Sequence, residues 1–200
     1  MKIINIVLKL ISIIIGIIVG TKQIINGTPV GDTLISFSLI IIVLLPNILR
    51  KLGSKITPIM ELMFLLFIFF AQTLGSVLDF YQKYYFYDKM VHFSSGLVSS
   101  FLGIYILVIL NIYNKKNLVF NIIMIIFTAM AIAGFWEIFE FVSNTIFGGD
   151  AQKVMLTGVN DTMTDIIVAL LGSLLISLLY MYEEQNDKKI IVKRFIAELK

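Results

Sequence analysis

The sequence predicts an all-α fold, a polytopic transmembrane helix bundle of about six spans with both termini in the cytoplasm. Hydrophobic residues make up 58% of the 200 residues and the mean hydropathy is +0.96, whereas a soluble domain usually carries more charge. Several stretches run for ~20 residues with almost no charge, which is the length that crosses the ~30 Å hydrocarbon core of a bilayer. Because no Pro/Gly/Ser-rich linker or repeat interrupts them, we expect residues 1–182 to form one bundle, followed by a cytoplasmic amphipathic tail at 183–200.

The predicted spans follow the apolar stretches, each bounded by charged or turn-forming residues. They are Ile3–Gly20, Thr33–Leu49, Ile59–Val77, about Met90–Tyr113, Leu118–Phe147 and Asp161–Tyr182. The first resembles a signal peptide, but Lys9 interrupts its apolar run and no A-x-A-like cleavage site follows, which favours an uncleaved anchor. The second is the least regular, because Pro46 and Asn47 interrupt its end.

The basic residues set the expected orientation. The loops after the second and fourth spans and the tail after the sixth are basic, with Arg50, Lys51, Lys55, Lys115, Lys116, Lys188, Lys189, Lys193, Arg194 and Lys200. The opposite side keeps only Lys22, Lys83, Lys89 and Lys153. Because cytoplasmic loops carry the excess of lysine and arginine, this pattern predicts that both termini lie in the cytoplasm.

The tail "DKKIIVKRFIAELK" at residues 187–200 predicts an amphipathic helix. Its apolar residues recur at helical spacing with basic residues between them. Such a helix either lies on the anionic inner leaflet or docks on the bundle, and the pattern fits both.

Acidic residues gather at the predicted outer ends of three spans. Asp88 lies four residues before His92 at the start of the fourth span, and Asp161 and Asp165 open the sixth in "GVNDTMTDIIVALLG". Residues of this spacing share one helix face. The stripes continue inward as small residues such as Gly96, Gly103, Ala169 and Gly172, which let membrane helices approach closely. The acidic faces are therefore expected to point into the bundle.

Capping gives some of these acids an ordinary explanation. Asp88, Asp161 and Asp165 lie at helix starts, where carboxylates cap amide groups and favour the helix dipole. His92, the only histidine, equally suits a neutral side chain hydrogen-bonded to Asp88 or to the backbone. Glu137 and Glu140 have no such explanation, because they lie about 15 and 10 Å deep at 1.5 Å per residue, near a helix C-terminus. An ionised carboxylate there is costly, so these two glutamates indicate a functional site.

The residue set also limits the chemistry. The chain has no cysteine, which removes thiolate metal ligands and thiol nucleophiles. Its loops lack the clustered basic and aromatic residues of a nucleic-acid surface, so no nucleic-acid partner is expected. Imidazole and carboxylates on three helices suit a divalent metal such as Mn, Zn, Fe or Mg, with His92, Glu137, Glu140 and Asp165 as predicted ligands.

These observations predict an outer-facing pocket in a multi-pass bacterial membrane protein whose partner is the lipid bilayer. The first hypothesis is a metal-assisted hydrolase or transferase acting on a phosphorylated or lipid-linked substrate. Its predicted catalytic residues are Asp88, His92, Glu137, Glu140 and Asp165, and its predicted substrate-binding residues are Lys89, Asp161 and Asn144. Two alternatives stay open, a proton- or cation-coupled carrier and a non-catalytic protein that binds a lipid or an antibiotic.

Three sequence blocks carry a family resemblance. "YDKMVHFSSG", "WEIFEF" and "GVNDTMTDIIVALLGS", in this order, resemble the YjdF-like family of bacterial inner-membrane proteins, which have no assigned activity. The resemblance covers roughly residues 78–173 and implies a location in the bacterial cytoplasmic membrane. The layout is also distantly similar to VanZ-like proteins, which are associated with glycopeptide resistance. That similarity would match Asp88, Lys89 and His92, then Glu137 or Glu140, then Asp161 and Asp165, although "EIFE" departs from the glutamine that often follows the VanZ-like glutamate.

Overall fold

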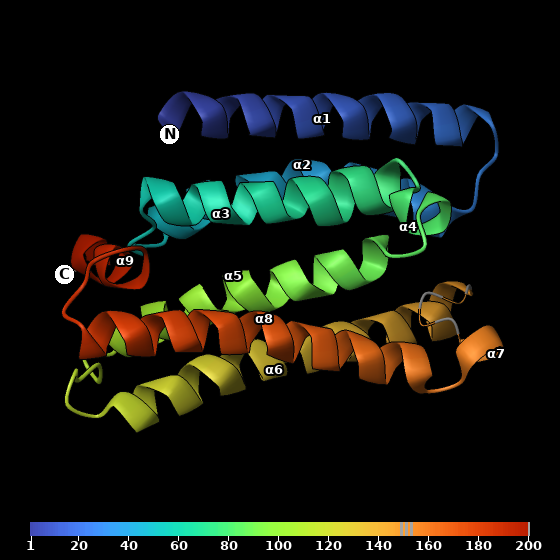
Figure 1. Cartoon of the computed structure of the whole chain (residues 1–200). Coiled ribbons are helices and arrows are strands. Elements are labelled where there is room, and N and C mark those ends of the chain that lie inside the picture. Colours follow the sequence, from blue (N-terminus) through green and yellow to red (C-terminus); the bar gives the residue numbers. More distant parts are fainter. Residues whose placement is uncertain (149, 151, 153, 200) are drawn as a thin grey trace. The chain divides into compact units, whose positions relative to one another are not determined.

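The computed structural model describes residues 1–148, 150, 152 and 154–199, and the described residues are helices joined by short connections without a strand (Figure 1). Six of the described helices are long and apolar enough to cross a membrane. They are α1 (Lys2–Ile25), α2 (Val30–Lys51), α3 (Pro58–Ile68) continued by the π-helical segment η1 (Phe69–Val77), α5 (Tyr87–Ile109), α6 (Leu118–Phe147) and α8 (Asn160–Gln185). Shorter helices are α4 (Phe80–Lys83), α7 (Val154–Thr157) and α9 (Val192–Leu199). The predicted all-α fold with six spans is confirmed.

Most span boundaries differ from the predicted ones by one to five residues, and the largest difference is at the end of α1, which continues past Gly20 to Ile25. α2 continues past Pro46 to Lys51, so the proline does not end this helix. A proline removes one backbone N–H, and membrane helices tolerate that loss where neighbouring groups satisfy the freed carbonyl. α5 ends at Ile109, earlier than expected, because the chain turns at Asn111, whose φ of 58° is left-handed.

The chain forms two compact units, Met1–Val91 and His92–Lys200, and α5 begins in the first and continues through the second. Each unit is described by itself below. The single bundle over residues 1–182 and the location of both termini in the cytoplasm stay predictions.

In the first unit, small and polar residues bring α1 against α2 and η1. A Cβ added to Gly16 would lie 2.7 Å from the Ser36 carbonyl oxygen, so glycine is needed at this crossing. Deeper in the unit, the Thr73 hydroxyl donates a 3.1 Å hydrogen bond to Ser12. The buried Glu61 carboxylate lies between Lys9 and Arg50, with which it forms ion pairs. These contacts compensate a charge that would be costly to bury alone.

In the second unit, α5 and α8 touch backbone to backbone. A Cβ on Gly96 would lie 1.9 Å from the Ala169 carbonyl oxygen, and one on Gly172 would lie 2.3 Å from the Phe93 carbonyl oxygen. Ser100 adds a 3.0 Å hydrogen bond to Ser173 across the same crossing. The predicted role of the small-residue stripes in close helix packing is therefore confirmed for this pair.

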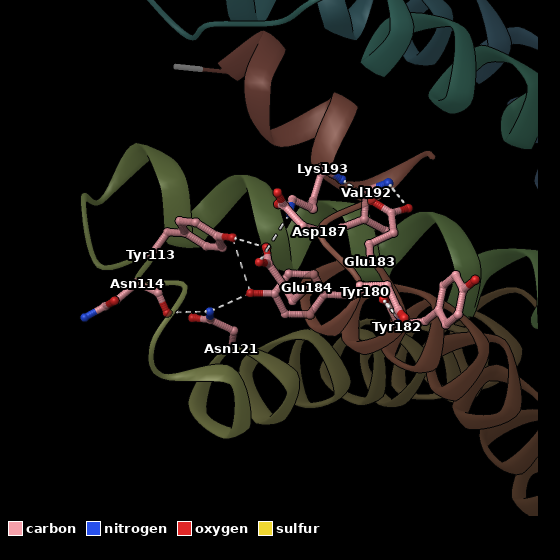
Figure 2. A network of polar contacts seen from close by, with 11 residues as sticks. Tyr113, Asn114, Asn121, Tyr180, Tyr182, Glu183, Glu184, Asp187, Val192 and Lys193 are labelled. Atoms are coloured by element: carbon pink, nitrogen blue, oxygen red, sulfur yellow. Dashed lines mark hydrogen bonds and ion pairs between the residues drawn. The ribbon is translucent and has the colours of Figure 1, made fainter. Parts of the chain in front are cut away.

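A network of polar side chains lies at the end of the second unit where α5 ends and α6 begins (Figure 2). The Asn121 side chain donates 2.8 Å to the Tyr180 hydroxyl, and the Tyr113 hydroxyl donates 2.9 Å to Glu184. Tyr113 lies in the loop between α5 and α6. Burial raises the pKa of its hydroxyl, and the contacts with Tyr180 and Glu184 raise that pKa further. Tyr113 therefore stays neutral at ordinary pH.

The tail helix α9 docks on the protein. The fully buried Glu183 carboxylate accepts hydrogen bonds from the backbone N–H groups of Ile191, Val192 and Lys193, at 2.8, 3.0 and 2.7 Å. Phe195 packs edge-on against Phe101 of α5, with ring centroids 5.0 Å apart. The apolar residues Val192, Phe195, Ile196 and Leu199 are all buried. Of the two readings of the tail, docking on the bundle is therefore the one that the structure supports.

Candidate functional site

The candidate site is built first on the crossing of α5 and α8. His92 lies in the second turn of α5, and Asp165 lies in the second turn of α8. The backbone contact between Gly96 and Ala169, one turn further along each helix, fixes the two side chains beside each other. The His92 Nε2 atom lies 3.9 Å from the Asp165 Oδ1 atom, and both side chains are buried. A protonated imidazole would form an ion pair there, and a neutral one can share a cation with the carboxylate.

Asp88 completes a buried group of three. It lies four residues before His92 on the same continuous helix, so helical geometry brings both side chains to one face. Asp88, His92 and Asp165 each offer one ligand atom, and these atoms all lie within 4.8 Å of one another. Among the described residues of the chain, this is the group whose spacing suits a metal ion. Carboxylate and imidazole together are the ligands of Zn, Mn and Fe sites in proteins.

Glu137 supplies a further carboxylate from α6. It is buried and lies within electrostatic reach of His92 and Asp165, with the Thr162 side chain beside it. Its Oε2 atom accepts a 3.3 Å hydrogen bond from the side chain of Gln152. Its Oε1 atom is buried and has no hydrogen-bond partner among the described residues. A buried oxygen without a partner is costly, so this atom is available to accept a hydrogen bond or to contact a cation.

Gln152 was not predicted from the sequence. It precedes α7 in the connection between α6 and α8, and its buried side chain also donates 3.1 Å to the Glu137 carbonyl oxygen. No pattern in the sequence marks this residue, because a single amide in a loop has neither helical periodicity nor a motif around it. Only the folded connection brings it to Glu137.

The other predicted site residues lie around this group. Glu140 is partly exposed, and its carboxylate accepts a 2.9 Å hydrogen bond from Trp136 Nε1. Asp161 is buried in the first turn of α8, while Lys89 and Asn144 are partly exposed. The group within 4.8 Å does not include these four residues or Glu137. The assignment of Glu140 as a metal ligand, and of Lys89, Asp161 and Asn144 as substrate-binding residues, stays a prediction.

The predicted ligand set and the observed group overlap in His92 and Asp165. Asp88, which the sequence predicts to be either a catalytic residue or a helix cap, is the third member of the group. Helix-start carboxylates are common, so the sequence alone could not separate a cap from a ligand. The structure adds that the Asp88 carboxylate lies close enough to Asp165 of α8 for the two to share a metal ion.

Six helices long and apolar enough to cross a membrane define the protein as a multi-pass membrane protein. The model of one family, described as Predicted membrane protein (DUF2238), matches residues 4–186, and the chain belongs to that family. This match supports the YjdF-like resemblance, whereas nothing in it supports the distant VanZ-like one.

One curated relative is an uncharacterized protein of Thermotoga maritima, 32% identical over 111 residues. The match spans 52% of this chain and 53% of the relative, so about half of each protein is covered. No solved structure matches the chain. The comparisons therefore place the protein in a membrane family without adding an activity.

Proposed function

We propose that this protein is a metal-dependent membrane enzyme, a hydrolase or transferase that acts on a phosphorylated or lipid-linked substrate. The observation that carries the proposal is the buried group of Asp88, His92 and Asp165, whose ligand atoms lie within 4.8 Å of one another. Ionisable side chains gathered inside a membrane protein commonly mark a functional site, and two carboxylates with an imidazole are a chemically suitable ligand set for a divalent ion. Mn, Zn, Fe and Mg stay the candidate ions.

A bound divalent ion supplies a Lewis acid for a phosphoryl oxygen and an acidified water as nucleophile. The chain's own residues then have separate tasks. Asp88, His92 and Asp165 would bind the ion. We assign Glu137 as the general base, because its Oε1 atom has no hydrogen-bond partner among the described residues. Gln152 positions Glu137 by holding its Oε2 atom. The first turns of α5 and α8 both begin at this end, and helix N-termini favour phosphate.

The carrier hypothesis has less support. A carrier needs a path from its ion site to the other side of the membrane. Next to the candidate site, α5 and α8 touch at Gly96 and Ala169 so closely that not even a methyl group fits. Beyond this crossing, Ile104 of α5 is almost completely buried, and the Ser100 and Ser173 hydroxyls are already hydrogen-bonded to each other at 3.0 Å.

The decisive experiment measures Mn²⁺ binding to the purified full-length protein by electron paramagnetic resonance. We expect one bound ion per chain, and an affinity at least ten-fold weaker in His92→Gln and in Asp165→Asn. Asp187→Asn is the matched control, because its side chain is 95% exposed and pairs with Lys193 at the opposite end of α8. Binding of equal strength in all four proteins, or no binding in the native one, would show that the metal centre is wrong.

A second measurement separates the reaction classes. The metal-loaded protein is incubated with phosphatidic acid and with farnesyl pyrophosphate, and released phosphate is measured. Turnover that is lost in Glu137→Gln supports the enzyme. Metal binding without turnover, accompanied by Mn²⁺ flux in proteoliposomes that Glu137→Gln abolishes, would support the carrier instead. Binding without turnover or flux would support the non-catalytic alternative.

A further inference from the structure

The connection between α6 and α8 exposes apolar side chains beside the candidate site. Met155 and Leu156 of α7 are 85% and 86% exposed, and Val154 and Val159 are also exposed. Four apolar residues within six positions are unfavourable in water. Because α6 and α8 are both apolar spans, the short segment between them lies at a boundary of the membrane.

The end of α6, which precedes this connection in the chain, is also apolar and exposed. Phe141, Ile146 and Phe147 in the last two turns of α6 are exposed on the protein, as expected of residues that face lipid in a spanning helix. A lipid surface therefore covers the adjoining residues of the connection more simply than a protein partner does.

The first backbone N–H groups of α7 are hydrogen-bonded within the protein. The carboxylate of Asp150 accepts hydrogen bonds from the backbone N–H groups of Val154 and Met155, at 2.7 and 3.2 Å. These are groups that a short helix otherwise leaves to solvent. Near the bilayer such donors are costly unless the protein satisfies them.

The same connection reaches the candidate site. Gln152 lies two residues before Val154, and its buried side chain is bonded to the main chain and to the carboxylate of Glu137. A lipid whose acyl chains lie beside α7 would therefore place its headgroup near Gln152 and Glu137. A soluble substrate gains nothing from this arrangement.

We infer that α7 lies in the headgroup region of the bilayer and that the ligand of the candidate site is a lipid-anchored phosphate, which reaches the site from that leaflet. In the predicted orientation this is the outer leaflet. The identity of the ligand rests on the proposed metal-dependent function, whereas the contact of α7 with lipid does not.

The lipid contact is tested with spin labels in the full chain reconstituted in phosphatidylcholine and phosphatidylglycerol vesicles. The protein has no cysteine, so Met155→Cys and Leu156→Cys each carry one label without background. Lys116→Cys, in the exposed loop before α6, is the matched control. We expect labels at 155 and 156 to collide more with oxygen than with a water-soluble nickel complex, and the label at 116 to show the reverse. Water-exposed labels at 155 and 156 would overturn the inference.

The ligand class is tested by phosphorus relaxation. Mn²⁺-loaded protein is mixed in detergent micelles with dilute phosphatidic acid or with glycerol 3-phosphate at the same concentration. We expect at least five-fold faster relaxation for the lipid phosphate than for the soluble one, and loss of this difference in Met155→Ser/Leu156→Ser with Mn²⁺ binding unchanged. Equal relaxation of the two phosphates would exclude the lipid-anchored ligand. Failure to bind Mn²⁺ would instead refute the proposed function and leave the spin-label result standing.

Discussion

At the residue scale, Glu183 shows that a buried acid can be structural. Its carboxylate is fully buried and accepts hydrogen bonds from three consecutive backbone N–H groups at the start of α9. Anionic side chains at a helix N-terminus are stabilising, and charge-assisted hydrogen bonds are stronger than neutral ones. Burial of a carboxylate in this protein is therefore not by itself evidence of a ligand site.

Replacing Glu183 tests this assignment. Glu183→Gln keeps the size but removes the charge and directs an amide N–H₂ at backbone donors, so we expect a loss of about 1–3 kcal/mol in the stability of the docked helix. Hydrogen exchange over residues 191–199 measures it. Glu198→Gln, at an exposed position of the same helix, is the control. Unchanged protection of α9 in Glu183→Gln would mean that apolar packing alone holds the helix.

Glu137 and Glu140 form the second residue-scale comparison. The sequence placed both on one stripe because they are three residues apart, but three residues on a helix differ by about 60° in direction. In the structure Glu137 is buried beside Gln152, whereas Glu140 is partly exposed beside Trp136. The spacing therefore placed both glutamates on one side of α6, but it could not predict that Glu137 is buried and Glu140 partly exposed.

We predict that the two conservative variants separate in metal affinity. Glu137→Gln should weaken Mn²⁺ binding about ten-fold, because it removes negative charge from beside the candidate ligands. Glu140→Gln should change affinity by less than about two-fold, since the Glu140 carboxylate is bonded to Trp136 and does not belong to the group whose ligand atoms lie within 4.8 Å of one another. Isothermal titration calorimetry on the two proteins makes the comparison. An equal loss in both would restore Glu140 as a ligand.

At the element scale, the crossing of α5 and α8 positions His92 against Asp165. A Cβ on Gly96 would lie 1.9 Å from a backbone oxygen of α8, so Gly96→Ala must move one helix away from the other. We expect a loss of about 1–3 kcal/mol in stability, as for other overpacked positions, together with weaker Mn²⁺ binding. Thermal unfolding in detergent and metal titration measure the two effects.

Gly134→Ala is the matched control for that prediction. Gly134 lies within α6, and a Cβ there would meet no atom within 4 Å among those described. Alanine is the better helix former by about 0.5–1 kcal/mol, so this variant should be neutral or slightly more stable. If Gly96→Ala behaves like Gly134→Ala, the close crossing is not what holds the site together.

At the scale of the whole molecule, the sequence predicts the membrane-spanning helices, because the thickness of the bilayer fixes their length and apolar character. The six spans follow from apolar length alone, and the predicted bounds of α6 agree with the observed ones. The connections do not follow in this way. α7, the left-handed turn at Asn111 and the approach of Gln152 to Glu137 depend on tertiary contacts. The tail is intermediate, because its periodicity predicts a helix with an apolar face but not the surface that covers that face.

The orientation of the whole molecule is the last prediction, because it decides on which side of the membrane the candidate site opens. The excess of lysine and arginine in alternate loops predicts cytoplasmic termini and an outer-facing site. Since the chain has no cysteine, single variants report sidedness directly. In intact cells, a membrane-impermeant maleimide should label Asn26→Cys, between α1 and α2, and should label Lys116→Cys only after permeabilisation. The reverse labelling pattern would mean that the site opens toward the cytoplasm, and its lipid-anchored ligand would then have to come from the inner leaflet.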